Sequence, residues 1–311
     1  MQLVLLGPQR FKPTLGEAVR SLEIEGKIAT ITAGWQEREP DDQELHSHLD
    51  GRTINLRLWE RAEEIFRRDL ELAAAHKERQ ERLRLLQGAY QVRLLHAMEA
   101  VTSLDGMKGD ARLLDGEREA AVEAVRQLDA HHLQRVQDIH ARFEARWRPG
   151  DRPDVGRHRE EIGRVLRHVD AVAISGGHVA VLLNRLRLFD VGAQIAERTV
   201  FAWSAGAMIA SERVILFHDS PPQGAGNAEV LDAGLGLCTG VVPLPHAWRR
   251  LEMDDRARLG RLARRFLPST CVAMEDSARL DWSPEGWNGS PGMKRIQTSG
   301  ELEEIGSVVV A

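Results

Sequence analysis

The sequence predicts an α/β protein with a mostly parallel sheet that is interrupted by a long helical hairpin. Short apolar runs alternate with amphipathic helical stretches in both flanks of the chain, which is typical of a parallel sheet with helices on both faces. All 12 prolines fall within residues 8–40 and 149–291, and the proline-free stretch between them has helical periodicity. We therefore expect an α/β domain made of residues 1–55 and 149–311, and a helical hairpin over 56–148.

Four apolar runs, each bounded by Gly, Pro or polar residues, are the expected strands of the parallel sheet. They are residues 3–7, 27–34, 170–175 and 198–203. Helical stretches at 13–22, 157–168 and 178–188 separate most of these runs. Near the C-terminus, 271–283 and 305–310 predict further strands joined by turns, in part antiparallel.

Two long helices are expected in the hairpin, because apolar residues recur at steps of three and four through 83–101 and 122–143. The stretch 103–117 between them is rich in Gly and Asp and predicts a break. Residues 56–148 carry 17 basic and 17 acidic side chains, as in a solvated, ion-paired coiled coil. The apolar periodicity would allow a homodimer through this hairpin. Three histidines of the second helix are expected to be solvated rather than to bind a metal: His131, His132 and His140.

Composition excludes several classes of protein. The 311 residues are 42% hydrophobic and carry a net charge of −5, which argues against a nucleic-acid partner. No stretch is long and apolar enough for a membrane span, and the N-terminus lacks the basic leader of a signal peptide. Cys238 and Cys271 make neither a disulfide framework nor a metal-ligand spacing. We expect a cytoplasmic protein.

Ser204 is the first candidate functional residue. The strand-like run 198–203 stops at this serine, and Ala205, Gly206 and Ala207 follow at once. A nucleophile on a sharp strand-to-helix turn needs such small neighbours, because the backbone is crowded there. The amide of Ala205 would then point at the reacting centre from the start of a helix. The alternative is a serine that caps an ordinary helix.

Two other stretches favour the catalytic interpretation. Gly176 and Gly177 follow the predicted strand 170–175 and open a helix, so their backbone amides can approach a ligand. His246 follows a strand-like run with two prolines, where an imidazole could act as a base on the serine. A glycine pair is common in loops, however, and a lone histidine is more often a surface or core residue.

These stretches together resemble peptidase family S51, the aspartyl dipeptidase and cyanophycinase group of the class I glutamine amidotransferase-like fold. The matching motifs are SGGH (175–178), WSAGA (203–207), LGLCTGVVPLPH (235–246) and AMEDSARL (273–280), in the family's order. The resemblance implies a flavodoxin-like, doubly wound sheet with a serine hydrolase site. It gives Ser204 the role of nucleophile and His246 that of general base.

The resemblance also implies a third, acidic member of the site. Glu275 matches the acidic position after the histidine, and Asp219 matches one between serine and histidine, so both stay open. Family members cleave beside an aspartyl residue, which makes Arg250 a candidate for holding a substrate carboxylate, although most arginines of its helix should be solvated. Position 178 departs from the family, because His stands where an amide or acidic residue is more usual. The segment LLGPQR (5–10) also has fewer glycines than the family's first strand.

The resemblance thus implies a serine-type peptidase that acts on a small peptide next to an acidic residue, without a metal or organic cofactor. It also implies that Gly177 and Ala205 supply oxyanion-hole amides, with Gly176 as a further candidate for oxyanion or substrate binding. Serine at the elbow, in place of the cysteine of an amidotransferase, argues against glutaminase chemistry. Two alternatives are a scaffold protein that uses the hairpin and has a vestigial site, and a hydrolase of non-peptide esters or amides. Trp35 follows the strand 27–34 and would either line the pocket or pack on the sheet rim.

Overall fold

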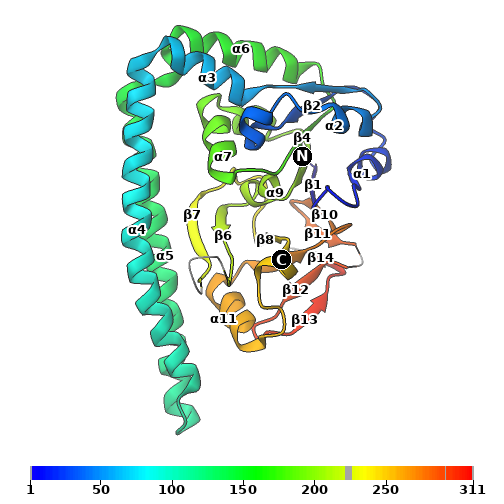
Figure 1. Ribbon diagram of the computed structural model, residues 1–311. Helices are drawn as coiled ribbons and strands as arrows, with labels where there is room; N and C mark the ends of the chain where they lie inside the picture. The colour runs from blue at the N-terminus through cyan, green and yellow to red at the C-terminus, as the bar shows by residue number, and fades with distance from the viewer. Residues whose placement is uncertain (1, 221–225, 291, 310–311) are drawn as a thin grey trace.

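An eight-stranded sheet forms the centre of the structure. The computed structural model describes residues 2–220, 226–290 and 292–309 (Figure 1). The strands lie in the order β14-β11-β10-β1-β5-β4-β2-β3. The run from β1 to β3 is parallel, and β10, β11 and β14 extend the sheet antiparallel to their neighbours. The bounds are β1 Gln2–Leu6, β2 Ile28–Ile31, β3 Thr53–Asn55, β4 Ala171–Ile174, β5 Thr199–Trp203, β10 Arg279–Ser283, β11 Gly286–Gly289 and β14 Ser307–Val309.

Helices cover both faces of this sheet, so the predicted fold class is confirmed. Alternate strand residues such as Val4 and Phe201 pack against α1 on one face, and the intervening residues such as Leu5 and Ala202 belong to a larger core on the other. Burial on both faces explains why these strands are continuous apolar runs. The first face carries α1 (Leu15–Ser21) and α2 (Gln43–His48). The second face carries α3 (Leu58–Arg68), α6 (Pro153–Arg167), α7 (Val179–Leu188), α8 (Val191–Ile195) and α9 (Ala205–Ala210).

Two smaller sheets, which the sequence did not predict, complete the fold. One has the order β13-β12-β9-β8, with β8 and β9 parallel, and the other is the antiparallel ribbon β6-β7. The strand that leads to His246 is β8, so it lies outside the central sheet. The bounds are β6 Arg213–Leu216, β7 Glu229–Ala233, β8 Val241–Pro245, β9 Thr270–Met274, β12 Lys294–Ile296 and β13 Leu302–Glu304. The last residue of the predicted strand 305–310 lies outside the described residues.

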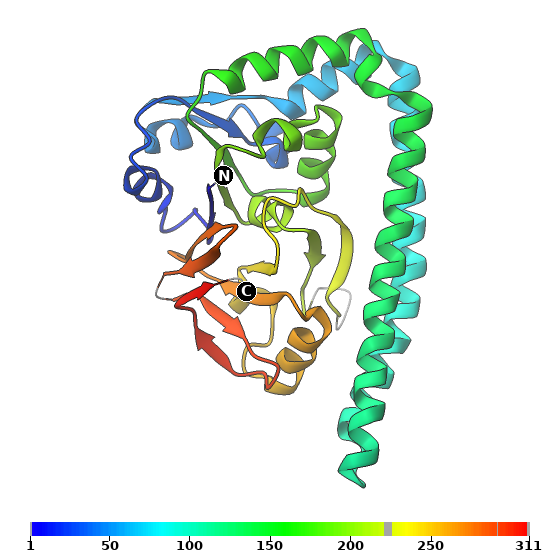
Figure 2. The same ribbon diagram turned by 180° about the vertical axis from the view of Figure 1, so that it is seen from behind.

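Two 37-residue helices run side by side along one side of the molecule (Figures 1 and 2). They are α4 (Leu70–Gly106) and α5 (Ala111–Trp147), each about 55 Å long at 1.5 Å per residue. The turn between them falls inside the predicted break. Leu85, Val92 and Leu95 of α4 are exposed. The homodimer through this hairpin, its coiled-coil character and the division into two domains stay predictions.

A buried ion pair joins the hairpin to the rest of the protein. Asp129 of α5 and Arg265 of α11 (Arg256–Phe266) are each 3% exposed, and the guanidinium donates to both carboxylate oxygens at 2.7 Å. Tyr90 of α4 donates to the same carboxylate at 2.7 Å and accepts from Arg265 at 2.9 Å. Arg265 also donates to the carbonyl of Ala228, just before β7. One cluster therefore connects α4, α5, α11 and the ribbon.

The expectation of solvated histidines in α5 is wrong for two of the three. His131 is exposed, but His132 is 2% exposed, stacks on Tyr90 with ring centroids 4.0 Å apart and bonds to Gln87. His140 bonds to Asp232 of β7 at 2.9 Å. These residues face the ribbon, a neighbour that the sequence did not predict. Within the described ranges, no helix is both long and apolar enough to cross a membrane.

Replacing Asp129 by Asn should destabilise the protein, because Arg265 would keep its charge in the interior without a counter-charge. Loss of one partner of a buried ion pair costs about 3–5 kcal/mol in the free energy of unfolding. Asp115→Asn on the same helix is the matched control, since Asp115 pairs with Arg118 at the surface, where such a pair contributes about 0–1 kcal/mol. Urea unfolding of both variants measures the difference. A similarly small decrease in the free energy of unfolding for both variants would contradict the assignment of Asp129 and Arg265 as a buried ion pair.

Candidate functional site

Ser204 occupies a strained bend between β5 and α9. Its backbone has φ 51° and ψ −121°, a conformation that costs a non-glycine residue of order 1–3 kcal/mol and is typical of functional sites. Gly206 makes the bend possible, because a Cβ there would lie 2.3 Å from the carbonyl oxygen of Ile174. The small residues after Ser204 therefore let the backbone turn sharply against β4.

Glycines from two neighbouring strand ends surround this bend. A Cβ on Gly176 would lie 2.8 Å from the Cβ of Ser204, and one on Gly177, where φ is 110°, would lie 2.3 Å from the carbonyl oxygen of Gly34. Only glycine fits at positions where backbones meet this closely. Gly34 was not among the predicted site residues. The signal that could have found it is its place at the end of the predicted strand 27–34, at the same sheet edge as the other two turns.

Two backbone amides at this edge are suited to hold a developing negative charge. The amide of Ala205 is the first of α9 and so has no partner within the helix. It lies 3.6 Å from the position that a Cβ on Gly176 would take. The amide of Gly177 has no backbone acceptor in the part of the chain that the structure describes. Both belong to turns that also contact Ser204, so an oxyanion could be held beside the hydroxyl.

His246 reaches Ser204 from the second sheet, the four-stranded sheet β13-β12-β9-β8. It follows β8 directly, and its backbone is left-handed, with φ 60° and ψ 36°. Its amide donates to the carbonyl of Met274 at 3.0 Å, which fixes it to the end of β9. The distance between Ser204 Oγ and His246 Nε2 is 3.3 Å. The hydroxyl and the imidazole, 42 residues apart in the sequence, thus meet at hydrogen-bond distance.

The environment of His246 favours its neutral form. Burial lowers the pKa of the imidazole most, and the positive charges of Arg250 and Arg249 lower it further, while Asp276 acts in the opposite direction. The pKa therefore lies below its ordinary value of about 6.5, and the ring is neutral at pH 7. A neutral imidazole can accept a proton from the serine hydroxyl. Asp276 was not singled out by sequence analysis, although it follows Glu275 directly.

Neither candidate acid contacts the imidazole. Glu275 Oε1 accepts from the amide of Trp248 at 2.9 Å, and Ala247 also donates to this carboxylate. Its carboxylate therefore holds the start of α10 (Ala247–Arg250), the short helix after His246. Burial raises the pKa of Glu275, although the two amides favour its ionised form.

Asp219 holds the other end of the same segment. Its Oδ2 accepts from the amide of Glu252 at 2.8 Å, and its Oδ1 pairs with Arg258 Nε at 2.8 Å. Its own amide donates to the carbonyl of Arg250 at 2.6 Å. Among the residues that the structure describes, no carboxylate accepts a hydrogen bond from His246. The two acids instead fix the backbone on either side of α10.

Arg250 is a half-buried cation without a carboxylate partner among the described residues. Its guanidinium lies over the ring of Phe217 at 5.5 Å, and burial and the neighbouring Arg249 lower its pKa. It lines the same cavity as Ser204 and His246. An unpaired cation in this position favours a ligand with a negative charge.

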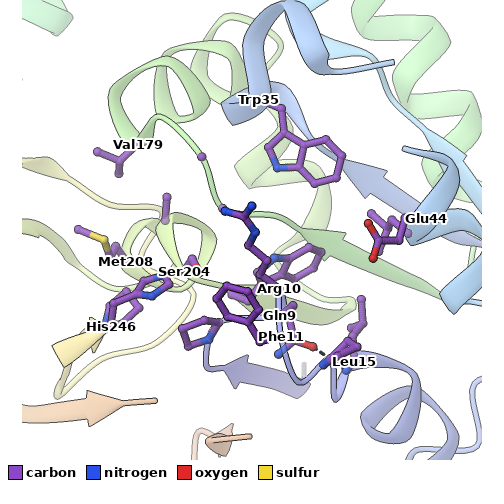
Figure 3. Close-up of a pocket in the computed structure, with 18 of the residues that line it drawn as sticks. Gln9, Arg10, Phe11, Leu15, Trp35, Glu44, Val179, Ser204, Met208 and His246 are labelled. Atoms are coloured by element: carbon purple, nitrogen blue, oxygen red, sulfur yellow. Dashed lines mark hydrogen bonds between the residues drawn. The ribbon is translucent and has the colours of Figure 1, made fainter. Parts of the chain in front are cut away.

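A cavity of about 910 Å³ opens around Ser204. Figure 3 shows Ser204, His246 and Met208 on one side of it and Trp35 and Glu44 on another, with Arg10 and Phe11 between them in this view. Trp35 thus lines the cavity, the first of the two positions expected for it. The lining residues are Pro8, Gln9, Arg10, Phe11, Pro13, Leu15, Trp35, Arg38, Asp41, Glu44, Leu45, His48, Gly176, Gly177, Val179, Trp203, Ser204, Ala205, Met208, Leu216, Pro245, His246 and Arg250.

His178 and the two cysteines do not line the cavity. His178 accepts from the amide of Val181 and caps α7. The two cysteines are buried, and burial raises the pKa of each thiol to about 12. No group of three or more His, Cys, Asp or Glu side chains within the described ranges is arranged to hold a metal ion.

The model of peptidase family S51 matches residues 123–280, just over half of the chain. Among solved structures, a peptidase from an acI-B1 Actinobacterium is 12% identical over 99% of this chain and 96% of that chain, with a TM-score of 0.49. A candidate peptidase E from Listeria monocytogenes EGD-e is 18% identical over 42% of this chain and 64% of that chain, with a TM-score of 0.31. Among curated proteins, none matches the sequence.

The charges around His246 predict opposite pKa shifts for two substitutions. Arg250→Gln should raise the pKa of His246, because it removes a nearby positive charge. Asp276→Asn should lower the pKa, because it removes a nearby negative charge that raises it. An NMR titration of the imidazole Cε1 proton measures both values without any substrate. Shifts of the same sign, or no shift in either variant, would contradict the electrostatic account.

Proposed function

The chain belongs to peptidase family S51, and from this premise we propose that it is a serine peptidase that cleaves a peptide or isopeptide bond next to an acidic, aspartyl residue. The observation that carries the proposal is the 3.3 Å contact between Ser204 Oγ and His246 Nε2 at the wall of the cavity. The strain at Ser204 supports catalysis over the alternative of an ordinary helix cap, since a serine that only caps a helix needs no positive φ.

The reaction proceeds in two acyl-transfer steps. Ser204 Oγ attacks the carbonyl carbon as its proton passes to His246 Nε2, and the amides of Ala205 and Gly177 hold the oxyanion. The C–N bond then breaks, and the proton moves from Nε2 to the leaving nitrogen. A water molecule next attacks the ester, gives its proton to Nε2 and releases the acid, while Ser204 regains its proton. Gly176 contributes by leaving space beside the Ser204 side chain.

Arg250 is the residue that we assign to the acidic group of the substrate. It is half-buried, lies in the same cavity as the serine and has no carboxylate partner among the described residues. A substrate carboxylate would supply the missing counter-charge through two hydrogen bonds. The same contact would bring negative charge near His246 and favour the imidazolium that forms during the reaction.

Ser204→Ala should lower kcat by about 10,000-fold or more, because no other group can form the ester. The thermal midpoint should stay within a few degrees, since alanine occupies the same bend. Ser103→Ala, an exposed position on the hairpin, is the matched control and should change neither quantity. The assay uses aspartyl dipeptides, simple esters and amides, with a fluorophosphonate probe to label the nucleophile. Activity that survives Ser204→Ala on every substrate would contradict the proposal.

Glu275 is proposed as a positioning residue that holds His246 through the amides of Ala247 and Trp248. Glu275→Ala should lower kcat by about 10- to 100-fold, because the histidine turn would lose its anchor. Glu275→Gln should restore most of the loss, because an amide oxygen also accepts from these donors. If Gln and Ala lower kcat equally in the same dipeptide assay, the negative charge itself is required and Glu275 acts as the triad acid.

A further inference from the structure

The loop between β1 and α1 has a firmly held base. The Gln9 side chain accepts from the amides of Thr14 and Leu15 at 2.7 and 2.8 Å, and it donates to the carbonyl of Gly7 at 2.9 Å. Gly7 itself packs against the carbonyl of Glu275, where a Cβ would come within 1.8 Å of the oxygen. These contacts fix both ends of the loop, and the residues between them project from it.

Arg10 and Phe11 are the projecting residues, and both line the cavity of Ser204. Figure 3 shows the Arg10 side chain pointing from the loop into the cavity, on the side where Trp35 lies. Phe11 is 71% exposed, and the Arg10 guanidinium lies 5.5 Å from its ring centroid. Across the described residues, Arg10 has no carboxylate partner within salt-bridge distance. A cation is therefore presented to the cavity without a counter-charge.

The cavity as a whole carries more positive than negative charge. Arg38 and Asp41 pair with each other at 3.2 Å, which leaves Arg10 and Arg250 as unpaired cations and Glu44 as the unpaired anion of the lining. The net charge of the chain is −5, so this balance is opposite to that of the protein as a whole. A volume of about 910 Å³ is large enough for a short peptide, including its ends.

We propose that Arg10 is a specificity-determining residue that binds the free C-terminal carboxylate of a short acidic peptide. This inference rests on the proposed peptidase function, in which Arg250 takes the acidic side chain. Such a peptide then has one remaining carboxylate, at its C-terminus, and Arg10 is the remaining unpaired cation. Phe11 and Trp35 provide apolar surface beside it. Arg10 lies outside residues 123–280, so the family match says nothing of its role.

The test compares an aspartyl dipeptide with its C-terminal carboxamide. Arg10→Gln should raise KM for the free acid about tenfold with kcat nearly unchanged, because it removes one charged hydrogen bond in binding. It should leave KM for the carboxamide unchanged. Lys12→Gln is the matched control, since it makes the same charge change on the same loop outside the cavity lining. An equal rise in KM for both peptides, no rise in KM for the free acid, or the same rise in Lys12→Gln would overturn the proposal.

Binding measured by calorimetry tests the role of Arg10 separately from the proposed peptidase mechanism. In a Ser204→Ala background, the free acid should bind about tenfold more tightly than the carboxamide, and Arg10→Gln should abolish the difference. Full activity of Ser204→Ala would remove the proposed mechanism, and the comparison of KM for the free acid and the carboxamide would then still test Arg10 by itself. Equal affinity of the two peptides, or no detectable binding of either one, would overturn the role of Arg10.

Discussion

The structure of the site depends on one steric constraint, the close contact of three strand ends at positions where only glycine fits. A Cβ on Gly34, Gly176 or Gly206 would come within 2.3–2.8 Å of an atom of a neighbouring strand end. Without this close packing, β5 could not end in the positive-φ bend of Ser204 beside the turn that contains Gly177. The central sheet therefore holds the proposed nucleophile and the proposed anion-binding amides in one rigid unit, as electrostatic preorganisation in acyl transfer requires.

The proposed base, His246, comes from a different sheet, so a second set of contacts must align it with Ser204. His246 leaves β8 in a left-handed conformation, and the following segment is held by Glu275 at its start and by Asp219 at its end. The backbone of Glu275 also contacts Gly7, at the end of β1. This residue thus links the histidine turn to the central sheet. A 3.3 Å contact between two sheets requires such a link, because an error of about 1 Å costs roughly a hundredfold in rate.

Sequence patterns predicted the parts of this structure that depend on local chemistry. The apolar runs gave β1, β2, β4 and β5, and the small residues after Ser204 indicated the bend. The ribbon β6-β7 was missed because β6 is short and β7 alternates in burial. The strand-like runs of β8 and β9 were recognised, but their pairing in a separate sheet was missed, because no local signal shows which strands pair. The positions of side chains relative to segments that are distant in sequence were missed for the same reason. No local signal shows that His132 and His140 face a ribbon, that Glu275 binds the amides after His246, or that Arg10 points into the cavity.

The hairpin contributes to the same architecture, and its charges explain how. Its acidic and basic side chains balance in number, as the sequence indicated, and several of its buried polar side chains face the ribbon and α11. Tyr90 accepts from the amide of Val230, Asp129 accepts from Arg265, and His140 bonds to Asp232. Arg79 instead bonds to Asn184 of α7. The ribbon follows α9, which begins directly after Ser204, and precedes β8, which ends directly before His246. A two-stranded ribbon is marginally stable alone, so the contacts of the hairpin support the chain segment that connects Ser204 to His246. The packing of the hairpin along the ribbon and α11 therefore supports the placement of the two proposed catalytic side chains.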